Sequence, residues 1–168
     1  MEETECESTF CEYYKPLLVE EIALVVYPAH AHFGKCLVIG TLACTSNRLE
    51  SLSVPAFPTD MQLPDGACSV ELCFNNFFGF IPRGKHVEIT GILKLRHTDT
   101  EHVTDAANLR STLLCLDTTV IKEEYEETCT RYKPFIEVDH IRIISHAREL
   151  ITCNLDIRKL YLLNQNER

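Results

Sequence analysis

The chain has 168 residues, of which 45% are hydrophobic, which is enough for one domain of ordinary size with its own core. Its net charge of −9 argues against a protein whose sole task is to grip the phosphate backbone of nucleic acid, because such chains are usually basic. The sequence contains neither the apolar run of a signal peptide nor a stretch as long as a membrane span, so we expect a protein of the cytosol or nucleus that does not contact a membrane.

The nine cysteines form no CxxC pair, and their odd number indicates reduced thiols that pack as small apolar side chains. A metal site could be imagined from one set of residues, which comprises Cys6, Cys11, His30, His32 and Cys36. Their spacing fits no zinc pattern. We therefore expect no metal and no cofactor.

Hydrophobic alternation and the placement of glycine and proline divide the chain into a tail, strands, loops and a final helix. The first part of the chain is expected to contain an acidic tail over 1–14, a strand or short helix over 17–26, a long β segment over 35–54 and a proline-rich loop over 55–67. Four further strands are expected over 67–77, 83–97, 112–122 and 134–145, with a polar loop over 97–111 and an acidic insert over 123–133. A helix over 146–165 ends the chain. The tail, a barrel over 15–145 and the helix are then the three parts of the molecule.

Two of the expected strands carry a glycine in the middle of a buried face. In "RGKHVEITGILKLRH", Gly91 falls on the same side as Val87, Ile89 and Leu93, and Gly40 lies within the segment 35–54. A strand that coils around a narrow barrel must bend sharply, and glycine permits the bend where a Cβ would collide with the opposite wall. The pattern predicts a small closed or partly closed barrel.

Four stretches of the chain resemble the strands and helix of an OB-fold. The first three strands are taken to be "CLVIGTLA", "DGACSVELCF" and "IPRGKHVEITGILK", and the fifth strand with its following helix is taken to be "PFIEVDHIRIISHARELITCNL". The order of elements over 35–165 is similar to that in the middle and small subunits of replication protein A and in telomere-capping complexes of the CST type and fly terminin. The resemblance implies a mainly β protein, a five-stranded Greek-key barrel with a C-terminal helix, at telomeres in the nucleus. The acidic insert before the last strand is longer than compact members of this group need.

The terminal helix has more apolar surface than one barrel requires. A helix packed on a single barrel needs one apolar stripe, whereas this one has two, with Leu150, Ile157, Leu160 and Tyr161 near one direction and Ile151, Leu155 and Leu162 near another. In OB subunits of the resembled type, such helices pair one subunit with another. The resemblance therefore implies that 147–163 binds a second OB-fold protein; the alternative is a helix sunk deeply into its own domain.

A barrel of this kind can also bind single-stranded DNA by stacking bases on aromatic side chains in a basic groove. The candidates for such a weak contact are Phe77, Phe78, Lys85, Lys94, Arg96 and His97. The aromatic residues, with Phe80, could instead close the barrel or contact a partner, and a short basic run is usually a solvated strand end.

Catalysis has no support in the sequence, which lacks the GxSxG, P-loop, HExxH and GxGxxG motifs. We expect a non-catalytic OB-fold subunit of a complex that protects single-stranded DNA or telomeres, with no small-molecule substrate. The alternative is an adaptor for protein interactions that has a small β-barrel and no role with nucleic acid.

Overall fold

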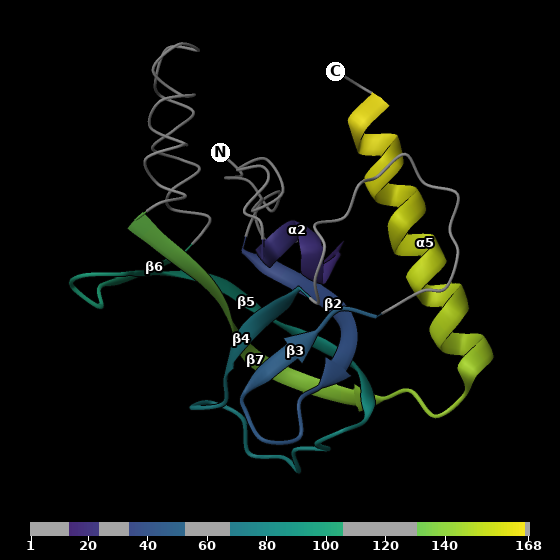
Figure 1. The fold of residues 1–168 in the computed structure, drawn as a ribbon, viewed down its shortest axis with the longest axis horizontal. Coiled ribbons are helices and arrows are strands. Elements are labelled where there is room, and N and C mark those ends of the chain that lie inside the picture. The colour runs from purple at the N-terminus through teal and green to yellow at the C-terminus, as the bar shows by residue number, and fades with distance from the viewer. Residues whose placement is uncertain (1–13, 24–33, 53–67, 106–130, 167–168) are drawn as a thin grey trace, which may run out of the picture.

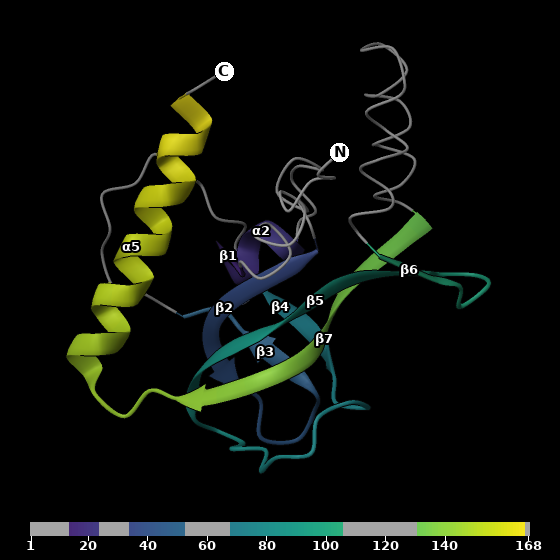
Figure 2. The same ribbon diagram turned by 180° about the vertical axis from the view of Figure 1, so that it is seen from behind.

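The computed structural model describes residues 14–23, 34–52, 68–105 and 131–166, with side chains as far as Leu160. Figures 1 and 2 show a small barrel with one long helix beside it. The elements are β1 (Lys15–Leu17), α2 (Val19–Ala23), β2 (Lys35–Leu42), β3 (Arg48–Glu50), β4 (Ser69–Cys73), β5 (His86–His97), β6 (Val103–Asp105), β7 (Tyr132–Ile143) and α5 (Ala147–Asn166).

Five strands close into a barrel in the order β2-β3-β4-β7-β5 and back to β2. All neighbours in this ring are antiparallel except β4 and β7, which run parallel. Closure leaves no free edge within the ring. The mainly β OB-fold with a C-terminal helix, expected from the sequence, is confirmed. Outside the ring, β1 pairs with β2 and β6 pairs with β5.

The barrel interior is filled by alternate side chains of each strand. On β5 the positions that the alternation predicted, Val87, Ile89, Gly91 and Leu93, are buried, and so is Leu95. The short helix α2 adds Val19 and Ile22 to the same apolar cluster. The sequence left the segment that contains α2 open between a strand and a short helix, and it contains both: residues 15–17 form β1, and Val19–Ala23 form α2.

Gly91 lies where β5 passes too close to β7 for a side chain. A Cβ at this position would collide with the carbonyl oxygen of Glu137 and would lie 2.8 Å from Cγ2 of Ile136. The register between the two strands also shifts at Thr90 and Gly91, which is the mark of a bulge. The glycine therefore permits the barrel to curl.

Gly40 has the same function on β2. A Cβ there would collide with the carbonyl oxygen of Glu50 and would lie 2.8 Å from Cγ of Leu49, both on β3. At both glycines the obstacle is the neighbouring strand. The expectation of a collision with the opposite wall was wrong in that respect.

The segment 35–54 is not one long strand. It turns back after Leu42, so that Leu42 pairs with Leu49 and Thr41 with Glu50 in a β2–β3 hairpin. The stretches taken as second and third strands are consequently the third and fourth strands of the barrel. The polar loop expected over 97–111 contains the short strand β6.

Several expected segments lie outside the described residues. They are almost all of the acidic tail, the loop over 55–67, the strand over 112–122 and most of the acidic insert. None of the helices in the described part of the chain combines the length and the apolar character needed to cross a bilayer.

We expect Gly91→Ala to lower the free energy of unfolding by about 2–3 kcal/mol, because the added Cβ would force β5 and β7 apart. Urea titration of the purified protein measures this. The matched control is Thr90→Ala on the adjacent, partly buried residue, which should cost less than about 1 kcal/mol. Equal costs at the two positions would contradict the close approach of the strands.

Candidate partner-binding surface

The helix α5 packs on the outside of the barrel with one side. Ile157 is buried in a second apolar cluster with Leu18, Ile39 and Ile144, and Leu150 is partly buried against it. Figures 1 and 2 show the helix standing beside the barrel after a short connection from β7. This cluster is separate from the barrel interior, so the helix is an addition to a barrel that already has its own core.

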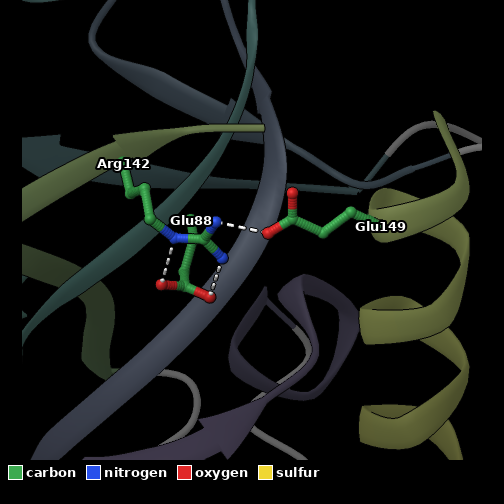
Figure 3. Close-up of polar contacts among 3 residues, drawn as sticks. All are labelled: Glu88, Arg142 and Glu149. Atoms are coloured by element: carbon green, nitrogen blue, oxygen red, sulfur yellow. Dashed lines mark hydrogen bonds and ion pairs between the residues drawn. The ribbon is translucent and has the colours of Figure 1, made fainter. Parts of the chain in front are cut away.

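An ion-pair network holds the first turn of α5 to the barrel wall (Figure 3). Nε and Nη2 of Arg142 on β7 donate to the two carboxylate oxygens of Glu88 on β5, at 3.1 and 3.0 Å. Nη1 of the same guanidinium donates to Glu149 on α5. The hydrogen bonds that Arg142 donates to Glu88 and then to Glu149 raise the pKa of its guanidinium. Because these groups are partly exposed, the network is worth about 1 kcal/mol. Its main effect is to fix the direction in which the helix starts.

A buried ion pair joins the middle of α5 to α2. Nη2 of Arg158 lies 3.1 Å from Oε1 of Glu20, and the two side chains are only 10% and 7% exposed. Nε of Arg158 is also buried and has no hydrogen-bond partner among the described residues. Burial of both charges makes this contact sensitive to the loss of either partner.

Beside this pair, Glu21 is a carboxyl group with an unusual pKa. Its Oε2 accepts a hydrogen bond of 2.7 Å from the backbone N–H of Leu18, which caps the start of α2. Burial raises the pKa of Glu21 from 4.5 to about 7, although the hydrogen bond from Leu18 and the charge of Lys15 oppose the rise. The segment α2, to which α5 is joined, therefore contains a carboxyl group that changes its protonation near neutral pH.

The rest of the apolar surface of α5 is not covered within the described residues. Ile151 is 54% exposed and Leu160 is 44% exposed, while Leu155 is partly buried. Ile151 and Leu155 are four residues apart and share one flank, whereas Leu160 lies on the other flank. The side chains of Tyr161 and Leu162 fall outside the described residues. Apolar surface outside the barrel contact is thus found at Ile151 and Leu160, while Leu150 and Ile157 pack on the barrel. The sequence grouping of Leu160 with Leu150 and Ile157 was wrong, because Leu160 lies outside their buried stripe.

Two of the basic residues considered for DNA contact, Lys94 and Arg96, are bound to carboxylates. Nζ of Lys94 lies 2.9 Å from Glu137 and 3.9 Å from Asp105. Arg96 lies 2.8 Å from Glu71 and also stacks over a phenylalanine ring. The pKa of Glu137 is lowered, chiefly by its hydrogen bond from Lys94. The positive charges on this strand end are thus largely balanced on the barrel surface.

The remaining candidates do not form one site with Lys94 and Arg96. His97 accepts hydrogen bonds from the backbone N–H groups of Asp99 and Thr100, each at 3.2 Å, and so serves the β5–β6 turn. Lys85 and Phe78 lie before the start of β5, at the opposite end of this 12-residue strand. Phe77 packs against the core beside Phe74.

The described residues offer little for metal or thiol chemistry. No three His, Cys, Asp or Glu side chains in this part of the chain are placed to share a metal ion. Cys36 is buried on β2, and burial raises its pKa to about 12, so that it stays a protonated, apolar packing group.

The contacts that orient α5 were missed by sequence reasoning. Arg158 and Glu20 are separated by 138 residues, and no local pattern links them. For Arg142 and Glu88, alternation along β7 and β5 placed each side chain on a face, but only the pairing of the two strands brings them together.

We expect Arg158→Met to lower the free energy of unfolding by about 3 kcal/mol, because it leaves the carboxylate of Glu20 buried without a counterion. The double variant Glu20→Leu/Arg158→Met removes both charges and should recover most of that loss. Guanidinium unfolding of the two variants compares them directly. A double variant as unstable as the single one would show that the pair is not buried as described.

We expect Glu21→Gln to stabilise the protein at pH 8 by about 1–2 kcal/mol and to change it little at pH 4. A carboxyl group whose pKa is raised on folding costs stability as the pH rises from its unfolded value through the folded one, here from 4.5 to about 7. Glutamine keeps the acceptor for Leu18 without the charge. Urea unfolding at several pH values measures the difference, and a gain that does not depend on pH would contradict the raised pKa.

Comparison with known proteins identifies the family. The family model of the Modigliani telomere protection protein matches residues 12–161. Protein modigliani of Drosophila melanogaster is 27% identical over 165 residues, which cover 90% of each chain. The match spans the barrel and most of α5 together, in agreement with the telomere-capping group that the strand pattern resembles. The chain therefore belongs to the Modigliani telomere protection family and acts in the nucleus, at chromosome ends.

Proposed function

We propose that this telomere-capping protein is a non-catalytic subunit that binds a second OB-fold protein through the uncovered flanks of α5. The observation that carries the proposal is the exposure of Ile151, at 54%, on a helix whose other side is buried against the barrel. Ile151 is not alone, because the partly buried Leu155 continues the same flank and Leu160 is exposed on the other. Apolar surface that continues along a helix beyond its packed face is a feature of protein interfaces. Membership of a telomere protection family supports a role within a complex.

The anchoring of α5 supports this proposal. Glu149 is bound to Arg142 at the start of the helix, and Arg158 is bound to Glu20 in its middle. A helix that is already fixed loses little conformational freedom when a partner binds to it. The uncovered flank with Ile151 and Leu155 is therefore presented in a defined position.

We further propose that the chain on its own makes at most weak contact with single-stranded DNA. Lys94 and Arg96 are both engaged by carboxylates, and the net charge of −9 repels phosphate. The same pairing favours the second candidate function, an adaptor with no role in nucleic-acid binding. In the first function, the assembled complex uses the surface of this barrel to hold DNA. In the second function, the complex does not need that surface for DNA.

We expect Ile151→Asp to abolish the recovery of an OB-fold chain when the tagged protein is purified from nuclei, because a charge would be buried in the interface. The matched control is Thr152→Asp, which places the same charge on an exposed neighbour. Quantitative mass spectrometry identifies the chains that are lost. Recovery of the same chains with Ile151→Asp, or loss of a chain without an OB-fold, would contradict the proposal.

Fluorescence anisotropy with a labelled single-stranded oligonucleotide tests the DNA part. The chain alone should bind weakly, and its binding should vanish as salt rises to the physiological range. If Lys94→Gln also weakens binding by the recovered complex, the barrel surface contributes to holding DNA. An unchanged affinity of the complex supports the adaptor function.

A further inference from the structure

The loop between β4 and β5, residues 74–85, carries two phenylalanines that the fold does not use. Phe78 is 98% exposed and Phe80 is 82% exposed, the two highest values among the large apolar side chains in the described part of the chain. Phe77, between Phe78 and the strand, packs on the barrel core beside Phe74. Single exposed apolar residues are ordinary, but two such rings that lie two residues apart form a candidate binding surface.

This aromatic loop is held in a defined shape. It turns at its start through a hydrogen bond of 3.0 Å from the N–H of Phe77 to the carbonyl of Phe74, and at its end Gly84 donates to the carbonyl of Leu42 at 2.8 Å. The guanidinium of Arg83 donates to the carbonyl of Ser46 and to Oδ1 of Asn47, both at 2.8 Å. The loop is thereby tied to the β2–β3 turn. Figure 1 shows both segments at the end of the barrel away from α2.

The charged side chains of the aromatic loop itself and of the adjoining turn are all basic, although Nδ2 of Asn76 in the loop donates to Oε1 of Glu137 on β7, at 2.9 Å. The aromatic loop and the β2–β3 turn over 43–48 contain Arg48, Arg83 and Lys85 and no acidic residue, in a chain whose net charge is −9. The guanidinium of Arg48 is used in hydrogen bonds to Ser69. Lys85 is exposed and has no carboxylate partner among the described residues.

This combination favours a protein over a nucleic acid as the occupant. A single strand needs several free cations to offset its phosphates, and here Arg48 and Arg83 are occupied by local hydrogen bonds, which leaves Lys85. Phenylalanine rings on a rigid loop are suited to fill an apolar pocket, and Lys85 beside them fits an acidic residue at the rim of that pocket. We propose that Phe78 and Phe80 insert into an apolar, acid-rimmed pocket of a partner protein, which makes the aromatic loop a second interaction surface, independent of α5.

The test uses the full chain and the double variant Phe78→Ser/Phe80→Ser, which removes both rings from solvent-exposed positions. A displayed library of random peptides is selected on the wild-type protein and counter-selected on the double variant. The matched control is Val103→Ser, which removes another exposed apolar side chain, on β6. Equal midpoints of thermal unfolding for the wild type, the double variant and the control verify that all three proteins are folded to the same extent.

We expect the selected peptides to combine apolar residues with Asp or Glu and to bind the double variant at least about tenfold more weakly than the wild type and the Val103→Ser control. Because the chain has no tryptophan, Phe78→Trp supplies a single reporter whose emission should shift to the blue when such a peptide binds. Peptides that bind the double variant equally well, or an absence of enriched peptides, would overturn the proposal. The proposal would also be overturned if no selected peptide needs the two rings, while binding of a single-stranded oligonucleotide or self-association of the chain does need them.

Discussion

A narrow barrel can bury only one side of a long helix, and this limit governs how the molecule is organised. The barrel has a complete core of its own, so the 20 residues of α5 add a layer outside it. Ile157 lies on the side of α5 that packs against the barrel, whereas Ile151, on the flank of the helix, keeps more than half of its surface in solvent. We propose that this uncovered flank is one half of an interface.

Ion pairs determine where that flank points. The Arg142 network fixes the first turn of α5, and the buried pair of Arg158 and Glu20 fixes its middle. Elsewhere on the barrel, Lys94 and Arg96 are bound to carboxylates, so the positive charge at this end of β5 is largely balanced within the fold. The chemistry of the surface thus favours contacts with proteins, at α5 and, as we propose, at the aromatic loop.

Alternation and glycine placement were sufficient to predict the barrel from the sequence. The alternation of apolar residues along β5 predicted that Val87 and Ile89 point into the barrel. Gly91 indicated a position where β5 has no room for a side chain, which the structure places against β7. The number of barrel strands was predicted correctly, but their assignment to segments was less accurate, because the three residues of β3 are too few to show a period and are defined by pairing with β2. Residues that orient α5 could not be predicted, since Glu20 and Arg158 lie 138 positions apart in the sequence and only the fold brings them together.

The most direct test is to measure the solvent exposure of Ile151 within the assembled telomere complex, by determining the structure of this chain together with the protein that co-purifies with it. The account predicts that a second OB-fold chain covers Ile151 and Leu155 while the ion pair between Arg158 and Glu20 stays intact. An assembled complex in which Ile151 remains in solvent, or in which α5 leaves its own barrel to bind elsewhere, would contradict it.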